Sequence, residues 1–298
     1  MRRSLRIGLV VVAAAAALGA ASSSVSGAPS PLRYIALGDS FSSGEGVEPY
    51  RPGTEVLGPV PDLCDRSFRA YPALIAGRRS SPGTWGFWAC SGAILADMTH
   101  ANHLYPREIA QLDRIAPPGK TDPDVDVVTV TIGGNDAQFG PATYRCLFAR
   151  LVPELGSCQG DYRTRVTDEI HRLATSLPRF YRTLRARAPF ARIFVLGYPN
   201  PFPRTAPLLS KCHLWFKSED LRFLSLEVDA LNRTVRAATI SAKAKVTYLA
   251  PTGFAGHDVC SSSPWFTGLV LNPVDTRSSF HPNQPGQLRL AKIVLAAL

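Results

Sequence analysis

Four short runs of β-branched and other apolar residues place the strongest limit on the fold of this chain. They span residues 34–37, 125–132, 193–196 and 246–249, and each is followed by a Gly or an Ala-Pro turn signal. The runs are continuous rather than alternating, which is typical of parallel strands that are covered on both faces. The sequence therefore predicts a parallel sheet between two outer layers.

Helical patterns occupy the intervals between these runs. Apolar residues recur at three-to-four spacing from Val166 to Leu184 and from Leu224 to Val235, and another such pattern follows Pro285. Strands that alternate with helices form a three-layer α/β/α sandwich with a mostly parallel central sheet, so we predict the α/β fold class. In such folds the functional residues gather at the carboxyl ends of the strands.

The first 28 residues differ in composition from the rest of the chain. Three arginines within residues 1–6 precede an apolar run of 15 residues, 7–21, and small residues follow as far as Ala28. This pattern is typical of a signal peptide, and the run is short for a membrane span. We expect a cleaved signal peptide at 1–28 and secretion of 29–298 as one domain, with an uncleaved membrane anchor as the alternative.

The net charge limits the partners of the protein. The formal charge is +10, but no block of five or more Lys or Arg occurs and the basic residues are not interleaved with aromatic ones. We therefore expect no nucleic-acid partner. A basic exterior favours peripheral contact with anionic lipid or a cell wall. We expect the protein to be a monomer.

Secretion changes what the cysteines predict. The six cysteines form an even set, and none has the C-x-x-C spacing of a zinc site or a redox pair. In an oxidising compartment they predict three disulfides. Six cysteines allow 15 pairings, of which sequential pairing is the simplest because it closes short loops. The cysteines are Cys64, Cys90, Cys146, Cys158, Cys212 and Cys260.

The first predicted strand leads into a serine with the features of a nucleophile. The strand is followed by GDSFSSGEG at 38–46, so Ser40 lies where the strand gives way to a glycine-flanked turn. A serine in such a turn has an exposed hydroxyl and a free backbone N–H, which can attack a carbonyl and donate to the resulting oxyanion. Taken alone, the motif also suits an ordinary turn or helix cap.

Three further motifs can complete a serine-based site. The second long strand ends in GGND, which brings Asn135 to the same sheet edge, where its amide can donate to an oxyanion or form an Asx-turn. Gly92, within ACSGA at 89–93, lets a backbone N–H approach a ligand closely. His281, within FHPN at 280–283, can act as a general base at neutral pH, although a single histidine in a loop is more often merely solvated.

Together the motifs resemble those of the SGNH/GDSL hydrolases, especially the secreted actinobacterial esterases and lipases with three disulfides. The resemblance spans about residue 33 to the C-terminus, and it implies the flavodoxin-like SGNH sandwich and an ester hydrolase that needs no metal or cofactor. It is carried by ALGDSFSSGEG at 36–46, ACSGA at 89–93, IGGND at 132–136, GYP at 197–199, GHDVC at 256–260 and HPN at 281–283.

The resemblance also implies roles for the site residues. Ser40 is the nucleophile and His281 the base, while the oxyanion hole consists of the backbone N–H groups of Ser40 and Gly92 and the amide of Asn135. The implied disulfides are Cys64–Cys90, Cys146–Cys158 and Cys212–Cys260, in agreement with sequential pairing.

The position of the usual triad acid departs from the family pattern. Many members have Asp three residues before the histidine, where this chain has Ser278. We therefore expect a Ser40–His281 dyad in which a backbone carbonyl orients the imidazole. A displaced triad with Asp258 or Asp275 as the acid is the alternative.

Other conspicuous residues have simpler interpretations. His100 and His103 are three apart on an expected helix, but the sequence fixes no further ligand, so we expect no metal site. We expect His257-Asp258 to belong to a structural, disulfide-tethered loop rather than to a catalytic pair. The aromatic residues of WGFW at 85–88 favour packing beside the neighbouring cysteine over an acyl groove.

These observations favour an exported serine ester hydrolase that forms an acyl-enzyme on lipid or short acyl esters. A carbohydrate (acetyl) esterase is the enzymatic alternative. The second alternative is a non-catalytic surface-binding protein on the same fold, and the presence of Ser40, Asn135 and His281 argues against it. An ordinary α/β-hydrolase is disfavoured because no Gly-x-Ser-x-Gly motif occurs.

Overall fold

A parallel sheet lies at the centre of the computed structural model, which describes residues 31–54, 62–79, 84–152, 154, 156–204, 212–272 and 275–298. Within these residues the sheet has five strands in the order β2-β1-β3-β4-β5, and all four pairings are parallel. This order is typical of flavodoxin-like sheets and confirms the predicted fold class. The predicted signal peptide lies outside the described residues. The strands are β1 (Tyr34–Gly38), β2 (Trp85–Phe87), β3 (Val127–Thr131), β4 (Arg192–Leu196) and β5 (Val246–Leu249).

The sequence predicts four of these strands and misses β2. Every residue of β1 and β3 is buried, as the continuous apolar runs indicate. β2 is a three-residue edge strand that pairs only with β1. Its aromatic residues pack rather than form an acyl groove, since the Arg51 guanidinium lies 4.4 Å from the ring centroid of Trp85.

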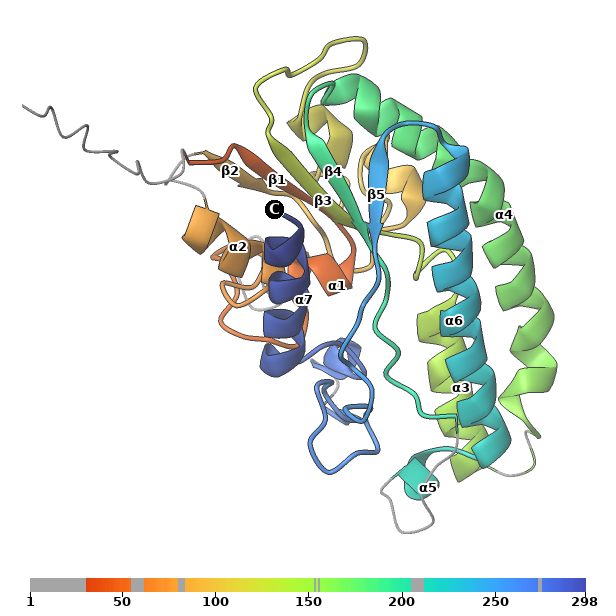
Figure 1. Cartoon of the computed structure of the whole chain (residues 1–298). Coiled ribbons are helices and arrows are strands. Elements are labelled where there is room, and N and C mark those ends of the chain that lie inside the picture. The colour runs from red at the N-terminus through yellow and green to blue at the C-terminus, as the bar shows by residue number, and fades with distance from the viewer. Residues whose placement is uncertain are drawn as a thin grey trace, which may run out of the picture. The chain divides into compact units, whose positions relative to one another are not determined.

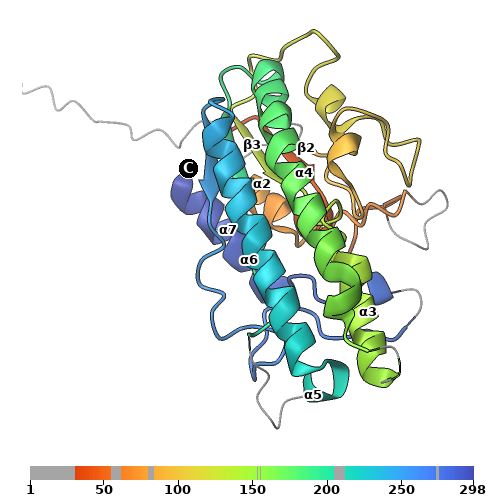
Figure 2. The ribbon, with the colours of Figure 1, turned by 90° about the vertical axis from the view of Figure 1, so that its right-hand side faces the viewer.

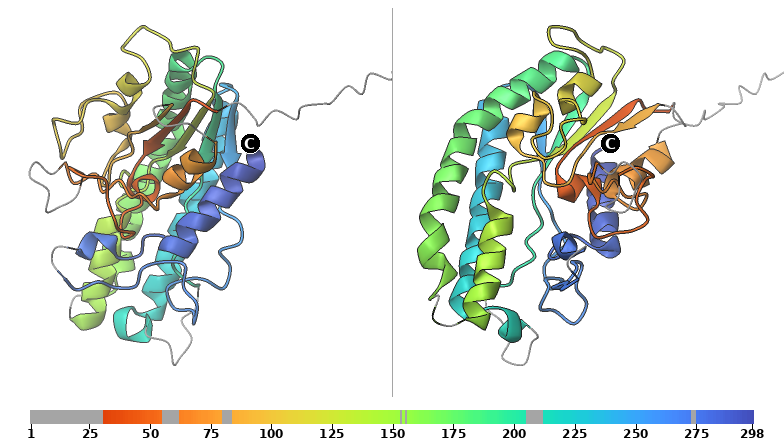
Figure 3. Two further views of the ribbon diagram at one scale, coloured as in Figure 1. Left: turned by 90° about the vertical axis from the view of Figure 1, so that its left-hand side faces the viewer. Right: turned by 180° about the vertical axis from the view of Figure 1, so that it is seen from behind.

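Helices cover both faces of the sheet (Figures 1 and 3). α2 and α7 pack together on one face, while α4 and α6 lie side by side on the other (Figure 2). None of the described helices is long and apolar enough to cross a membrane. The helices are α1 (Ser40–Ser43), α2 (Tyr71–Arg79), α3 (Phe139–Leu151), α4 (Cys158–Arg187), α5 (Cys212–Trp215), α6 (Ser218–Ser241) and α7 (Gln284–Ala297).

α4 and α6 are long enough to extend beyond the sheet. α4 has 30 residues, which span about 45 Å at 1.5 Å per residue, and α6 has 24. The strands have at most 5 residues, so the amino-terminal halves of both helices extend past the carboxyl ends of the strands, where α3 packs against them (Figure 1). The predicted apolar stripes form their buried faces. The two helices therefore form a wall beside the sheet edge.

Three disulfides tie the loops to this framework. The pairs are Cys64–Cys90, Cys146–Cys158 and Cys212–Cys260, as the resemblance implies, and the described residues contain no free cysteine. The first holds the loop that follows β2, the second joins α3 to the start of α4, and the third joins α5 to the loop that follows β5.

Candidate active site

The turn after β1 positions Ser40 at the carboxyl edge of the sheet. Gly38 has a φ of +128°, and a Cβ added to it would lie 2.4 Å from the Thr131 carbonyl oxygen, so only glycine fits between β1 and β3. The next backbone N–H, of Asp39, donates to that same carbonyl at 2.9 Å. The Asp39 carboxylate caps α1 by accepting from the Phe41 N–H at 3.1 Å. Ser40 thus begins a helical turn directly at the sheet edge.

His281 lies within hydrogen-bond distance of Ser40. Its Nε2 is 2.7 Å from Ser40 Oγ, and its Nδ1 is 3.2 Å from the Ser279 carbonyl oxygen. A carbonyl only accepts, so this arrangement fits the tautomer in which Nδ1–H donates to Ser279 and Nε2 accepts from the Ser40 hydroxyl. The imidazole ring also packs against the Phe41 ring at 5.1 Å between centroids.

The acidic alternatives are bound elsewhere. The Ser278 hydroxyl donates to the Asp275 carbonyl at 2.7 Å, and the Asp275 carboxylate accepts from the Asn272 amide at 2.8 Å. The Asp258 carboxylate accepts from the Cys260 N–H at 2.9 Å. Among the described residues no carboxylate is hydrogen-bonded to His281, so the geometry is that of a dyad oriented by a backbone carbonyl.

Ser40, Gly92 and Asn135, which carry the three predicted N–H donors, all line one cavity. The Asn135 amide donates to the Ala93 carbonyl at 2.9 Å, which fixes its direction and leaves its second N–H. Gly92 has a φ of +79°, which favours glycine in the loop that follows the Cys64–Cys90 disulfide. Within the described part of the chain, the backbone N–H groups of Ser40 and Gly92 donate to no other protein group. The arrangement suits an oxyanion hole.

The cavity beside these groups has a volume of about 260 Å³. Ser40, Asn135 and His281 line it together with other polar residues, but most of its lining is apolar. Such a cavity can hold an acyl chain with its carbonyl near the serine. The apolar and aromatic lining comprises Phe41, Leu104, Phe139, Tyr144, Tyr198, Pro199, Pro201, Phe202, Val228, Leu231 and Phe280.

Tyr198 joins the two loops that carry Ser40 and Asn135, a contact that the sequence does not reveal. Its buried hydroxyl donates to the Asp39 carboxylate at 2.5 Å and accepts from the Gly134 N–H at 2.8 Å. Burial raises the pKa of Asp39 to about 7, although the hydrogen bond from Tyr198 acts in the opposite direction. The sequence contains Tyr198 within the GYP motif but gives no sign of this bridge.

Gln111 is a second positioning residue without a sequence signal. It is buried, and its side chain accepts from the Gly38 N–H at 2.7 Å and donates to the Gly38 carbonyl at 2.9 Å. This pair of bonds satisfies the backbone of the strained residue at the end of β1. Gln111 lies 73 residues after Gly38 in the sequence, and the two residues meet only in the folded chain. No local pattern can therefore predict the contact.

A partly buried charged cluster links the histidine loop to the nucleophile loop. The Arg277 Nε is 3.4 Å from the Glu45 carboxylate, and its guanidinium also pairs with Asp65. The Ser91 hydroxyl donates to Glu45, which connects the Gly92 loop as well. Burial and the neighbouring Glu45 carboxylate raise the pKa of Asp65 to about 7, while Arg277 opposes this rise. The cluster thus fixes three loops of the site relative to one another.

The expectation that His100 and His103 lie on a helix is wrong. They follow a short 3₁₀ turn, Leu95–Met98, and the buried Asp97 carboxylate accepts from the N–H groups of Ile94 and His103. These side-chain bonds compete with a helical backbone. The Nδ1 of His103 is 2.8 Å from Asp97, whereas that of His100 faces the Ala96 carbonyl at 3.2 Å.

His257 and Asp258 belong to a structural loop, as expected. The His257 ring stacks on the Trp265 ring at 3.8 Å between centroids, and its Nδ1 lies 2.7 Å from the Ser263 carbonyl. Neither residue lines the cavity that holds Ser40.

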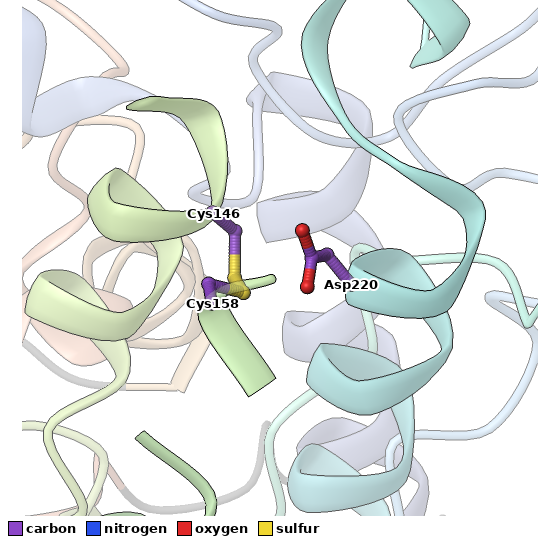
Figure 4. A group of neighbouring side chains, drawn as sticks. All are labelled: Cys146, Cys158 and Asp220. Carbon is purple, nitrogen blue, oxygen red and sulfur yellow. A yellow bond between two sulfur atoms is a disulfide. The ribbon is translucent and has the colours of Figure 1, made fainter. Parts of the chain in front are cut away.

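Two clusters of described residues have the spacing of metal ligands. Cys146, Cys158 and Asp220 form one of them (Figure 4), and Asp62, Cys64 and Glu108 form the other. In both, the cysteine sulfur takes part in a disulfide and is not a thiolate, the form that binds metal. Asp220 instead accepts from the hydroxyl of Ser157, the residue that caps α4, at 2.7 Å. The donor atoms in these clusters therefore do not suit a metal ion.

Comparison with known proteins connects this geometry to a family. A profile of the GDSL-like Lipase/Acylhydrolase family matches residues 36–289. "Lipase" of Streptomyces rimosus is 32% identical over 289 residues, 96% of this chain and 94% of that protein. "Lipase 2" of Streptomyces coelicolor is 35% identical over 283 residues, 90% of this chain and 86% of that protein.

Two solved structures have a similar fold. Phospholipase A1 from Streptomyces albidoflavus NA297 superposes with a TM-score of 0.69 at 26% identity, over 89% of this chain and 98% of that one. The extracellular lipase from Streptomyces rimosus superposes with a TM-score of 0.67 at 28% identity, over 89% of this chain and 99% of that one.

Proposed function

The chain belongs to the GDSL-like lipase/acylhydrolase family and is an ester hydrolase, and from this premise we propose that it cleaves lipid acyl esters through a Ser40–His281 dyad. The observation that carries the proposal is the 2.7 Å contact between Ser40 Oγ and His281 Nε2 in the lining of a mostly apolar cavity.

Acylation begins with proton transfer from the Ser40 hydroxyl to Nε2 of His281. The serine oxygen attacks the ester carbonyl, and the carbonyl oxygen becomes an oxyanion. The Nδ1–H of His281 donates to the Ser279 carbonyl, which holds the ring in the tautomer that can accept this proton. The imidazolium then protonates the leaving alcohol, and an acyl-Ser40 ester remains.

The oxyanion is stabilised by three donors in this mechanism. They are the backbone N–H groups of Ser40 and Gly92 and the free N–H of the Asn135 amide, and the bond to Ala93 holds that amide in place before the substrate arrives. Deacylation repeats the sequence with water in place of serine. Its product is the free fatty acid, and no cofactor takes part.

The substrate class follows from the cavity and from the relatives. The mostly apolar walls favour an acyl chain over a sugar ring. The similar proteins are named as lipases and as a phospholipase A1, which supports a lipid ester as the substrate. The residues of the site come from one chain, so we propose that the monomer is active.

Secretion is part of the same proposal. The predicted leader at 1–28, the three disulfides and the extracellular origin of the Streptomyces rimosus relative support export of 29–298 as one domain. N-terminal sequencing of protein from the culture medium should find a start near Pro29.

A panel of esters tests the substrate class. The protein should hydrolyse p-nitrophenyl esters from acetate to palmitate and release fatty acid from phosphatidylcholine, while acetylated xylan should remain unchanged. The Ser40→Ala variant is the control for background hydrolysis. Release of acetate from xylan at a higher kcat/KM than any lipid ester would instead make the protein a carbohydrate esterase.

A further inference from the structure

The most exposed apolar side chains are unevenly distributed over the molecule. Within the described residues, six large apolar side chains expose 56% or more of their surface. Four of them lie on α3, on α5 and in the loop 267–272, which are close together beyond the carboxyl ends of the strands (Figures 1 and 2). These four are Phe148, Leu151, Leu214 and Leu271. We call them the apolar rim.

One face of α3 runs from the cavity into this rim. Gly140 and Tyr144 line the cavity that holds Ser40. Phe148 and Leu151 follow Tyr144 at spacings of four and seven residues, so all four lie on one side of the helix. The first half of this face is therefore a wall of the cavity, and its second half is exposed.

The other two rim residues are held beside α3 by hydrogen bonds. Arg150, at the end of α3, donates through Nε to the carbonyl of His213, the residue before Leu214, at 2.9 Å. The Tyr144 hydroxyl donates to the Thr276 carbonyl at 2.9 Å. The Thr276 hydroxyl in turn donates at 2.6 Å to the carbonyl of Asn272, the neighbour of Leu271. These bonds hold the segments that carry the rim beside α3 and near the cavity.

The charged side chains of α3 itself do not oppose an anionic surface. α3 carries Arg145 and Arg150 and no acidic residue. Arg145 pairs with Asp161 of α4 at 2.5 Å, whereas Arg150 is exposed at the rim itself.

We propose that the apolar rim docks the enzyme on the surface of a lipid aggregate, so that an acyl chain passes along α3 into the cavity. Isolated exposed apolar side chains are ordinary, but a contiguous group beside a ligand cavity marks a contact surface. A second protein chain seated beside the cavity would bring no substrate to it, whereas a lipid surface would supply acyl chains. This inference rests on the proposed lipid substrate and adds the residues that contact the aggregate.

Binding to lipids that cannot be hydrolysed separates docking from catalysis. Vesicles of diether phosphatidylcholine, with and without diether phosphatidylglycerol, contain no carboxylic ester bond, so the wild-type protein can be used in co-sedimentation. The double variant Phe148→Gln/Leu151→Gln should bind these vesicles at least ~10-fold more weakly, because two apolar side chains no longer leave water. Circular dichroism should show the same unfolding temperature, since both side chains are exposed.

The chain offers a matched control. Phe190 and Ile240 expose 79% and 72% of their surface, and they lie near the ends of α4 and α6, beside the amino ends of the strands (Figure 1). Phe190→Gln/Ile240→Gln should bind vesicles like the wild type. Equal binding by both double variants would overturn the proposal. So would a wild-type dimer in analytical ultracentrifugation that Phe148→Gln/Leu151→Gln converts to a monomer, because the rim would then be an interface between copies. If the vesicles bind as predicted and phosphatidylcholine with ester bonds is not hydrolysed, the docking surface holds and the proposed lipase activity fails.

Discussion

Replacement of Tyr198 by Phe tests whether the bridge between the nucleophile loop and the Asn135 loop stabilises the site. The substitution removes one oxygen from a buried side chain and leaves the ring in place. Two groups lose their partner: the Asp39 carboxylate loses a donor at 2.5 Å, and the Gly134 N–H loses its acceptor at 2.8 Å.

The size of the effect follows from these two losses. Above pH 7, where Asp39 is mainly ionised, a hydrogen bond to its charge contributes about 1.5–3 kcal/mol, and a buried donor left without an acceptor costs about 1–3 kcal/mol. The Gly134 bond is only partly buried, so we expect Tyr198→Phe to lower the free energy of unfolding by about 2–4 kcal/mol. Because Asp39 caps the turn of Ser40, kcat on p-nitrophenyl butyrate should also fall by about 10-fold or more, with a smaller change in KM.

Tyr181 supplies the matched control for this substitution. It is also fully buried, in α4, but its hydroxyl has no hydrogen-bond partner among the described residues. Tyr181→Phe should therefore leave the free energy of unfolding unchanged or raise it. Urea unfolding followed by circular dichroism, with disulfides intact, measures both variants. If Tyr198→Phe costs no more than Tyr181→Phe, the bridge does not contribute as we argue.

Five further substitutions test the catalytic roles and the raised pKa of Asp39. Asn135→Ala should lower kcat by about 10²–10³ with little change in KM, because its amide binds an oxyanion that exists only in the transition state; a change in KM alone would assign it to substrate binding. Activity should stay within ~10-fold of the wild type in each of the variants Ser278→Ala, Asp258→Asn and Asp275→Asn. Loss of a true triad acid costs about 10⁴ in kcat, so a fall of that size in a folded variant would establish a triad. Burial raises the pKa of Asp39 to about 7, above its value in the unfolded chain, so the unfolded state ionises first and the free energy of unfolding should fall as the pH rises from about 4 to 7. Asp39→Asn should remove this component in urea titrations across the same range, and an unchanged pH dependence would refute the raised pKa.

The sequence predicts the fold wherever the signal is local. The runs that become β1 and β3 are continuous because both faces of these strands are covered, and this burial is visible in the sequence itself. β2 escapes prediction because three residues with a central glycine carry no strand periodicity. The strand forms by pairing with β1, in which Tyr34 lies opposite Trp85, 51 residues later in the sequence. The error at His100 and His103 has a comparable cause, since the side chain of Asp97 decides the local backbone.

The same distinction between local and long-range signals applies to the candidate site. The sequence predicts that Ser40, Asn135 and His281 lie together, and all three line one cavity, because each follows a strand or precedes a helix in a recognisable motif. The contacts of Tyr198 and Gln111 could not be predicted, since they depend on which loops meet after folding. The orientation of the histidine lies between these cases. The missing acid at Ser278 predicts a backbone carbonyl in its place, but only the structure indicates which carbonyl faces the imidazole.

Covalent labelling of Ser40 tests the central claim most directly. The wild-type protein should be incubated with a fluorophosphonate probe, digested and examined by mass spectrometry, in parallel with Ser40→Ala. Since the proposed mechanism makes Ser40 the nucleophile beside His281, the probe should modify the peptide that contains Ser40, at that residue alone, and abolish ester hydrolysis. The Ser40→Ala variant should take up no probe and lose activity. A label on another residue, together with a fully active Ser40→Ala variant, would contradict the account.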